Sequence, residues 1–142
     1  MISVDTNILI HAANPASALH AKALEFMQGQ VESPLALCEL VLVELYMALR
    51  NPVIFPKPYP ACRAAEYCLR LKSNPAWTCI DYAPAVAQAL WNWATDTERG
   101  YRTIVDARIA LTLRHHGIRE FATMNLKDFQ GFGFQRVWNP LA

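Results

Sequence analysis

The chain alternates short apolar runs with longer stretches in which apolar residues recur at helical spacing. Short runs between turn residues are typical of buried strands, and a spacing of three and four is typical of helices packed on a core. The pattern predicts strands at 2–4, 77–80, 121–123 and 134–137, a turn at 125–129, and helices at 8–13, 16–28, 35–49, 61–72, 84–98 and 103–116. Because helices separate the strands, we expect an α/β fold, a three-layer sandwich with a mostly parallel sheet flanked by helices.

Prolines and glycines mark several boundaries in this pattern. Pro84 suits the first turn of the helix that it opens, and Gly117 can end the preceding helix in a left-handed conformation. Residues 53–60 hold prolines at three positions, which excludes a regular helix or a central strand. Candidate site residues lie on both sides of this stretch, so we interpret it as an ordered loop within a single domain, 1–142, whose length suits one core.

Composition narrows the classes of partner and compartment. The formal net charge is only +1, so nucleic acid would have to bind at a local basic patch. The cysteines, Cys38, Cys62, Cys68 and Cys79, lack C-x-x-C spacing and have apolar neighbours, which predicts reduced core thiols. There is no signal-peptide pattern and no apolar run near the roughly 18 residues of a membrane span. We therefore expect a soluble, cytoplasmic protein with no membrane partner.

Three acids stand out from their surroundings. Asp5 ends the first strand, Glu44 interrupts an apolar helix, and Asp106 opens a later helix. Each also has an ordinary explanation. Asp5 could be a helix N-cap, and Asp106 could form a capping box with Thr103. Glu44 has no lysine or arginine three or four positions away, so its ordinary explanation is a distant partner such as Arg108.

The positions of these acids predict that they meet. Strand ends and helix starts share one edge of a parallel sheet, and Glu39 points away from Glu44 on the helix, so only one of these two glutamates should reach the site. Crowded like charges repel one another, and a divalent cation holds them ionised. Oxygen ligands without cysteine or paired histidine favour Mg²⁺ or Mn²⁺ over zinc. Such ions serve phosphoryl chemistry above all.

The order of motifs resembles the PIN-domain nucleases, and specifically the VapC-type toxins of bacterial toxin–antitoxin pairs. The matching segments are Val4-Asp5-Thr6-Asn7-Ile8-Leu9, Leu42-Val43-Glu44-Leu45 with Arg50-Asn51-Pro52, Asp106-Ala107-Arg108-Ile109-Ala110, Ala122-Thr123-Met124-Asn125 with Lys127-Asp128-Phe129, and Asn139-Pro140. They span nearly the whole chain in the order of the family, and their combination is more specific than any one of them.

The resemblance implies a metal-dependent endoribonuclease of a type II toxin–antitoxin system. Asp5, Glu44 and Asp106 would hold Mg²⁺, for which Mn²⁺ can substitute, and an activated water would attack an RNA phosphodiester to leave a 5′-phosphate and a 3′-hydroxyl. The resemblance also implies two protein partners. These are a second copy of the chain, giving a homodimer, and an antitoxin whose C-terminal segment blocks the acidic pocket, with an arginine in place of the metal's charge.

The fourth site position departs from the family pattern, because family members often carry Asp where this chain has Asn125. A neutral amide can bind a metal-bound water but weakens a second-metal site. Asp128 either compensates for this change or caps the turn before Phe129, and we favour the turn. Thr6 and Thr123 are expected to donate hydrogen bonds to the ligating carboxylates.

Basic and aromatic residues outside the motifs suggest further contacts. Phosphate contacts could come from Arg99, Arg102, Arg108, Arg114 and Lys127. His115 and His116 lie at a helix end, where the helix dipole alone favours them. Trp91 and Trp93 are two positions apart on one helix, so they cannot both face the core, and one is a candidate for a dimer or antitoxin interface.

Two other functions remain open from the sequence. One is a PIN module that has lost turnover through Asn125 and only binds RNA or a protein partner. The other is a receiver-type phosphoacceptor domain. That fold needs adjacent acids near the first strand and a lysine at a later strand end, whereas Asp5 has no acidic neighbour and Thr123 is followed by Met124.

Overall fold

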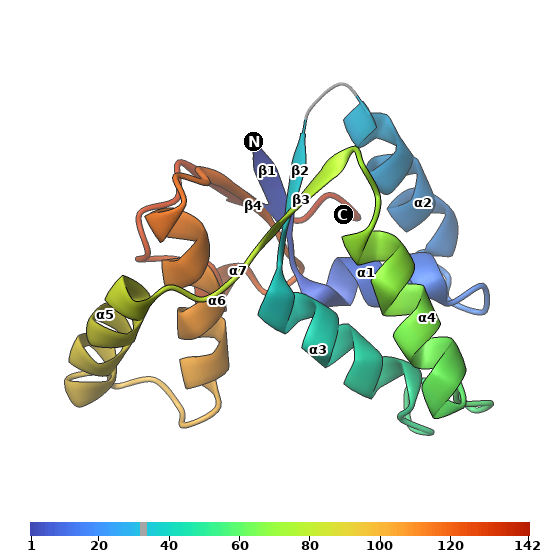
Figure 1. Ribbon diagram of the computed structural model, residues 1–142, viewed down its shortest axis with the longest axis horizontal. Helices are drawn as coiled ribbons and strands as arrows, with labels where there is room; N and C mark the ends of the chain where they lie inside the picture. Colours follow the sequence, from blue (N-terminus) through green and yellow to red (C-terminus); the bar gives the residue numbers. More distant parts are fainter. Residues whose placement is uncertain (32–33) are drawn as a thin grey trace.

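The computed structural model describes residues 1–31 and 34–142, and its centre is a five-stranded sheet (Figure 1). The strands are β1 (Ile2–Val4), β2 (Leu35–Cys38), β3 (Trp77–Ile80), β4 (Glu120–Ala122) and β5 (Arg136–Trp138). Their order is β3-β2-β1-β4-β5, and every neighbouring pair is parallel. The first strand therefore lies in the middle, between β2 and β4, with Val4 opposite Ala122.

Helices lie on both sides of the sheet, as the sequence predicts. The helices are α1 (Thr6–Ala13), α2 (His20–Gln28), α3 (Glu39–Leu49), α4 (Ala61–Lys72), α5 (Pro84–Thr95), α6 (Thr103–His115) and α7 (Leu126–Phe129), with a 3₁₀ turn at Gly29–Val31. Figure 1 shows the sheet nearly edge-on, with α2 and α4 on one side and α5 and α6 on the other. On the first side α1 packs on α2 and α3, and α3 packs on α4. The expected three-layer α/β sandwich is confirmed.

Apolar strand residues form the middle of the core. All four residues of β2 are buried, as expected for a strand that is covered on both faces. Ser3 of β1 is fully buried too, and its hydroxyl donates a hydrogen bond of 2.6 Å to the carbonyl oxygen of Ala36. On α6 the inner face carries Ile109 and Leu113, both fully buried. The centre of the sheet is thus fixed by packing on both sides.

The predicted helix at 35–49 is wrong in its first four residues. Leu35–Cys38 is the strand β2, and α3 begins only at Glu39. An apolar run buried on every side has neither the period of two nor that of 3.6, so the sequence pattern gave no sign of where strand changes to helix. The extended backbone of Cys38, with φ −75° and ψ 132°, marks the change.

Most other elements agree with the prediction apart from their ends. The strands at 2–4 and 77–80 and the helix at 61–72 match β1, β3 and α4. α2 begins at His20 rather than at residue 16, α5 ends at Thr95 rather than at residue 98, and α6 ends one residue early, at His115. β4 and β5 lie at 120–122 and 136–138, and the predicted turn at 125–129 contains the short helix α7. Gly117 has φ +79°, so the predicted left-handed helix end is confirmed.

The proline-rich stretch after α3 is an ordered loop, as expected. Phe55 is buried in the core, and the backbone N–H of Tyr59 donates to the carbonyl oxygen of Leu49 at 2.9 Å. The Tyr59 ring lies edge-on to the rings of Phe55 and Tyr67, with centroid separations of 5.8 and 6.2 Å. Aromatic packing therefore holds this loop against α4. In the described part of the chain, no helix has the length and apolar character to cross a bilayer.

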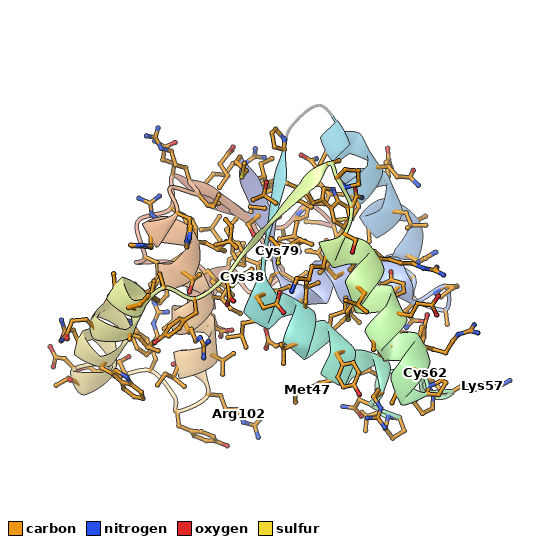
Figure 2. All side chains as sticks on the ribbon, in the orientation of Figure 1. Cys38, Met47, Lys57, Cys62, Cys79 and Arg102 are labelled. Carbon is orange, nitrogen blue, oxygen red and sulfur yellow. The ribbon has the colours of Figure 1, made fainter. Side chains whose placement is uncertain are left out.

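The cysteines do not share one environment, which corrects the prediction of core thiols at one position. Cys38 is buried, Cys68 and Cys79 are half-buried, and Cys62 is exposed. Figure 2 shows Cys38 and Cys79 near the sheet and Cys62 at the outer end of α4. All four thiols are free. Cys62 lies on the outward side of its helix, so its apolar neighbours in sequence were misleading.

Candidate metal centre

The site lies where the connections from two neighbouring strands diverge. β1 and β4 are adjacent and parallel, and the chain leaves β1 for α1, whereas it leaves β4 for α7, which packs on α6. Open α/β sheets bind ligands in the crevice at such a point, beyond the carboxyl ends of the strands. Asp5 directly follows β1, and Thr123 directly follows β4. The backbone N–H of Asp5 donates to the carbonyl oxygen of Ala122 at 2.9 Å, which joins the two strand ends.

Asp5 is held by hydrogen bonds from three residues. Its Oδ1 accepts the backbone N–H of Thr6 at 2.8 Å, and its Oδ2 accepts the Thr123 hydroxyl at 2.6 Å and the Asn7 amide at 3.3 Å. The first bond is the N-cap interaction that the ordinary explanation predicts. The second reaches across to β4, which a simple cap does not require. The carboxylate is 6% exposed, so these donors fix its position.

Glu44 faces the same site from α3. Its Oε1 accepts the Thr6 hydroxyl at 2.9 Å. No basic side chain lies within 4.0 Å of this carboxylate among the described residues. Arg108, the partner considered from the sequence, instead lies over the Tyr82 ring at 4.0 Å from its centroid.

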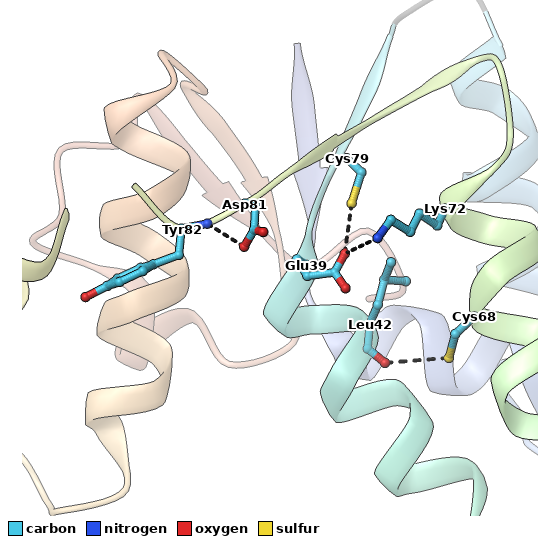
Figure 3. A network of polar contacts seen from close by, with 7 residues as sticks. All are labelled: Glu39, Leu42, Cys68, Lys72, Cys79, Asp81 and Tyr82. Atoms are coloured by element: carbon cyan, nitrogen blue, oxygen red, sulfur yellow. Dashed lines mark hydrogen bonds and ion pairs between the residues drawn. The ribbon is translucent and has the colours of Figure 1, made fainter. Parts of the chain in front are cut away.

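Glu39 belongs to a different network, as the helical spacing indicates. Its Oε2 accepts the Cys79 thiol at 3.2 Å and lies 3.4 Å from the Lys72 ammonium (Figure 3). The Cys68 thiol, in the same view, donates to the carbonyl oxygen of Leu42. Glu39 does not line the cleft that Glu44 lines. The expectation that only one of these glutamates reaches the site is therefore confirmed.

Asp106 approaches from the first turn of α6. The expected capping box is absent, because α6 has no side-chain bond at its N-cap and the Thr103 hydroxyl donates to the carbonyl oxygen of Gly100 at 2.6 Å instead. Asp106 also has no basic side chain within 4.0 Å among the described residues. The capping-box explanation for this acid therefore does not hold, although Asp106 does lie in the first turn, where an acid complements the helix dipole.

One cleft of about 800 Å³ brings the three acids together. The polar residues of its lining are Asp5, Thr6, Asn7, Glu44, Tyr46, Arg50, Asn51, Asp106 and Asn125. The predicted convergence of distant carboxylates at one edge of the sheet is thus observed. Thr6 and Thr123 both donate to these carboxylates, as expected.

Asn125 and Asp128 take different places around this cleft. Asn125 is exposed and lines the cleft, and its backbone N–H donates to the Thr123 hydroxyl oxygen at 3.0 Å. Asp128 lies in α7 and does not line the cleft, and its backbone N–H donates to the carbonyl oxygen of Asn125 at 3.2 Å. No side-chain hydrogen bond caps the start of α7, and the Asp128 carboxylate lies near enough to Asp5 and Asp106 to raise the pKa of both.

Burial and mutual repulsion raise the pKa values of the acids. Burial raises the pKa of Asp106 to about 7, and the nearby charges of Asp5, Asp128 and Glu44 contribute in the same direction. Burial also raises the pKa of Asp5 and of Glu44, against the lowering effect of hydrogen bonds from Thr123 and Thr6. These carboxylates therefore repel one another when ionised, and a cation among them would relieve the repulsion.

The donors in the cleft fit a hard divalent cation. Carboxylate and amide oxygens surround it, with neither cysteine nor histidine in its lining. Among the described residues, no three Asp, Glu, His or Cys side chains lie close enough together to hold a metal ion by themselves. Mg²⁺ commonly keeps several waters and binds through only one or two carboxylates. An open, oxygen-lined cleft suits that mode of binding.

Most of the basic residues that were expected to contact phosphate bind other groups of the protein instead. Arg99 donates to the carbonyl oxygens of Asp128 and Gln130, at 2.8 and 2.7 Å, and Arg114 donates to that of Ile118 at 2.8 Å. Arg50 was not predicted as a contact, yet within the described chain it is the basic residue that lines the cleft. Arg50 directly follows α3, the helix that carries Glu44, and nothing in the local sequence marks it as a cleft residue.

The histidines and tryptophans behave as expected. The His116 ring hydrogen-bonds to the carbonyl oxygen of Thr112 at 2.9 Å and lies edge-on to the His115 ring. Trp93 packs on Phe132, with ring centroids 6.0 Å apart, whereas the side chain of Trp91 is 60% exposed. One tryptophan of the pair is therefore left at the surface.

Comparison with known proteins places the chain in a family. Residues 2–133 match the PIN domain. The chain belongs to the PIN-domain family. It is also 44% identical over 142 residues to "Ribonuclease VapC24" of Mycobacterium tuberculosis, a similarity that covers 99% of this chain and 97% of the relative. The PIN ribonucleases to which it is similar are metal-dependent enzymes.

Solved structures of PIN proteins share the fold at low sequence identity. VapC20 of Mycobacterium tuberculosis, described as a sarcin-ricin loop cleaving toxin, superposes with a TM-score of 0.71 at 22% identity and covers 94% of this chain and 96% of its own. A VapBC2 complex of Rickettsia felis bound to promoter DNA has a TM-score of 0.66 at 18% identity, with 98% of each chain covered. These likenesses support the three-layer architecture, and family membership excludes the receiver-type interpretation.

Proposed function

We propose that this protein is a Mg²⁺-dependent endoribonuclease, the toxin of a type II toxin–antitoxin system. The observation that carries the proposal is the meeting of Asp5, Glu44 and Asp106 in one cleft without a basic partner among the described residues. The 44% identity to a relative named as a ribonuclease supports RNA as the substrate. A cytoplasmic location follows from such a substrate.

In this proposal Asp5, Glu44 and Asp106 hold the ion, and Mn²⁺ can take the place of Mg²⁺. An ion held there would supply Lewis-acid chemistry, because it would lower the pKa of a water and neutralise charge on the phosphodiester. Thr6 bridges two of the ligands, because its backbone N–H binds Asp5 while its hydroxyl binds Glu44. Thr123 fixes the other oxygen of Asp5. These bonds orient the carboxylates before substrate arrives.

Asn125 is the fourth residue of the proposed site. Its amide can orient a water or a phosphate oxygen but adds no negative charge to the cleft. With Asp128 outside the cleft lining, the site offers three carboxylates. We infer that this donor set binds one ion more strongly than a second.

Two protein partners complete the proposal. The structural neighbours include toxin–antitoxin complexes, which supports an antitoxin that covers the acidic cleft. A homodimer is the second expected assembly, and the exposed face of Trp91 on α5 is a candidate for either contact.

The decisive test is cleavage of structured RNA by the purified protein in Mg²⁺, beside the Asp5→Asn variant. We expect the wild type to cut and the variant to lose at least a hundredfold in rate, and EDTA to abolish cutting. Sequencing of the product ends should find 5′-phosphates and 3′-hydroxyls. Cleavage by both proteins would indicate a contaminant. RNA binding without cleavage by either would favour the alternative of a PIN module that lacks turnover, for which Asn125 would be responsible.

A further inference from the structure

Two arginine–tyrosine pairs lie near the acidic cleft, one in its lining and one directly before the helix that contributes Val105 and Asp106 to it. On α3 and the residue after it, Arg50 Nη1 donates to the Tyr46 hydroxyl at 3.0 Å, and its guanidinium lies 5.6 Å from the ring centroid. At the start of α6, Arg102 Nε donates to the Tyr101 hydroxyl at 3.1 Å, also with the guanidinium 5.6 Å from the ring centroid. The two pairs thus repeat one local arrangement.

The first pair belongs to the cleft wall itself. Tyr46 and Arg50 both line the cleft, and Glu44 lies on the same helix. Beyond the acids this wall becomes apolar, with Met47 and Ile54 among its lining residues. The side chain of Met47 is 64% exposed, which is unusual for an apolar residue beside a charged site.

The second pair borders the cleft from the other side of the sheet. Tyr101 and Arg102 directly precede α6, and the first turn of that helix contributes Val105 and Asp106 to the cleft. Tyr101 is 83% exposed. Figure 2 shows Arg102 and Met47 projecting from the same edge of the molecule, one from the α6 side and the other from α3. The acids therefore lie between two exposed aromatic and basic positions.

Neither arginine is neutralised by the protein. No carboxylate lies within 4.0 Å of Arg50 or Arg102 among the described residues, whereas Arg70 and Arg136 each have a glutamate within that distance. Neither binds a backbone carbonyl oxygen as Arg99 and Arg114 do. A free guanidinium beside an aromatic ring presents a phosphate donor next to a surface on which a base can stack.

We propose that the Arg50–Tyr46 and Arg102–Tyr101 pairs bind single-stranded RNA on either side of the phosphate that enters the acidic cleft. Each guanidinium contacts a backbone phosphate, and each tyrosine ring accepts an unstacked base. Bases in a duplex keep their faces against their neighbours, so this arrangement selects unpaired RNA. The inference rests on the proposed function and names its substrate class and the residues that position it.

The test uses the full chain with the Asp5→Asn substitution, which allows binding to be measured without cleavage. The probe is a fluorescein-labelled RNA of about twelve nucleotides with no internal pairing, and the same sequence annealed to its complement. Fluorescence anisotropy at several salt concentrations gives the affinity and its salt dependence. Arg50→Gln and Arg102→Gln are made in this background, with Arg63→Gln as control, since Arg63 is an exposed arginine beside tyrosines on α4, away from the cleft.

We expect each cleft substitution to weaken binding of the single strand about fivefold to tenfold and to reduce its salt slope by roughly 0.7, as for the loss of one phosphate contact. Arg63→Gln should change neither value. Tyr46→Leu and Tyr101→Leu should weaken binding about tenfold, while Tyr→Phe at the same positions should keep most of it. The duplex should bind more weakly than the single strand.

Equal losses for the Arg63 control and the cleft variants would overturn the inference, as would equal or tighter binding of the duplex. If an acidic decapeptide instead bound more tightly than RNA and lost affinity with the same substitutions, that result would indicate a surface for docking a protein, and it would also overturn the inference. The proposed function fails separately, if the wild type does not cut RNA in Mg²⁺. When Arg50→Gln and Arg102→Gln are made in the active protein, which keeps Asp5, each should raise the KM for RNA cleavage with little change in kcat.

Discussion

Asp5 receives hydrogen bonds from Thr6, its neighbour, and from Thr123, which is 118 positions away. At the scale of single residues the site is an arrangement of threonine donors on carboxylate acceptors. The donors compensate part of the cost of burying the acids, and both acids that they bind line one cleft. Small changes in these hydroxyls should therefore alter metal binding without altering the fold.

Thr123→Val should weaken Mg²⁺ binding about tenfold, because loss of an outer hydrogen bond frees the Asp5 carboxylate to rotate. The concentration of Mg²⁺ at half-maximal RNA cleavage measures the effect. Thr123→Ser keeps the hydroxyl and is the control, expected within about twofold of the wild type. Equal behaviour of the valine and serine variants would show that the 2.6 Å bond has no influence on the metal.

The thiols should differ in their reactivity towards iodoacetamide. Cys62 is exposed, whereas burial and the Glu39 carboxylate raise the pKa of Cys79 to about 11. Because the thiolate is the reacting form, mass spectrometry at pH 8 should find Cys62 alkylated first and Cys79 at least tenfold more slowly. In Cys62→Ser the fast label should disappear. A Cys79 that reacts as fast as Cys62 would contradict the network in Figure 3.

The three acids could be found from the sequence because each interrupts a pattern that is otherwise apolar or helical. Arg50 could not, since an arginine at a helix end is unremarkable until the helix is placed against the cleft. The same is true of Asn7, whose Oδ1 accepts the backbone N–H of Met124 at 3.3 Å. A residue whose role depends only on a neighbour that is distant in sequence cannot be recognised from the local sequence.

At the scale of elements, the short helix α7 depends on one arginine from another connection. Arg99 lies between α5 and α6, and it donates to two carbonyl oxygens, those of Asp128 and Gln130, at the end of α7. Its guanidinium also lies 5.4 Å from the Phe132 ring centroid. A helix of four residues cannot be stable alone, so this contact holds the segment that carries Asn125.

Arg99→Gln should lower the free energy of unfolding by about 1 to 3 kcal/mol, since two charged hydrogen bonds to backbone are lost. Urea denaturation followed by circular dichroism measures the change. Arg119→Gln is the control, because Arg119 is exposed, and it should stay within about 0.5 kcal/mol of the wild type. A similar loss in both variants would show that Arg99 has no special role.

Helices and strands were predicted best where the hydrophobic periodicity was regular or where proline and glycine marked the ends. The helix Ala61–Lys72 has a polar and an apolar face, and its ends were predicted correctly. The strand β2 was missed because all four of its residues are buried. A strand that is buried on both faces does not alternate apolar and polar residues, and strand prediction depends on that alternation. Only pairing with β1 and β3 reveals it.

At the scale of the whole molecule, the acidic cleft works against folding when it holds no cation. Burial and the neighbouring acids raise the pKa of Asp106 from 3.8 to about 7. Between these values the folded protein keeps a proton that the unfolded chain has released, so the free energy of unfolding falls as the pH rises through this range. Burial shifts Asp5 and Glu44 in the same direction.

In EDTA, the protein should therefore be less stable at pH 8 than at pH 5. Asp106→Asn should flatten this dependence and, at pH 8, raise the free energy of unfolding by roughly 1 kcal/mol. Urea titrations across this pH range measure both effects, and added Mg²⁺ should stabilise the wild type at pH 8 more than the variant. Stability that rises with pH in EDTA would contradict the repulsion inferred in the cleft.

The long path of the chain between Asp5 and Thr123 has a consequence for synthesis on the ribosome. The growing polypeptide carries Asp5 from the beginning, but Glu44, Asp106 and the Thr123 hydroxyl arrive one after another, the last only when most of the sequence has been translated. A nascent chain in which β4 has not yet been translated consequently lacks part of the site. The proposed metal centre is thus completed only after β4 and Thr123 have been translated and have folded against β1.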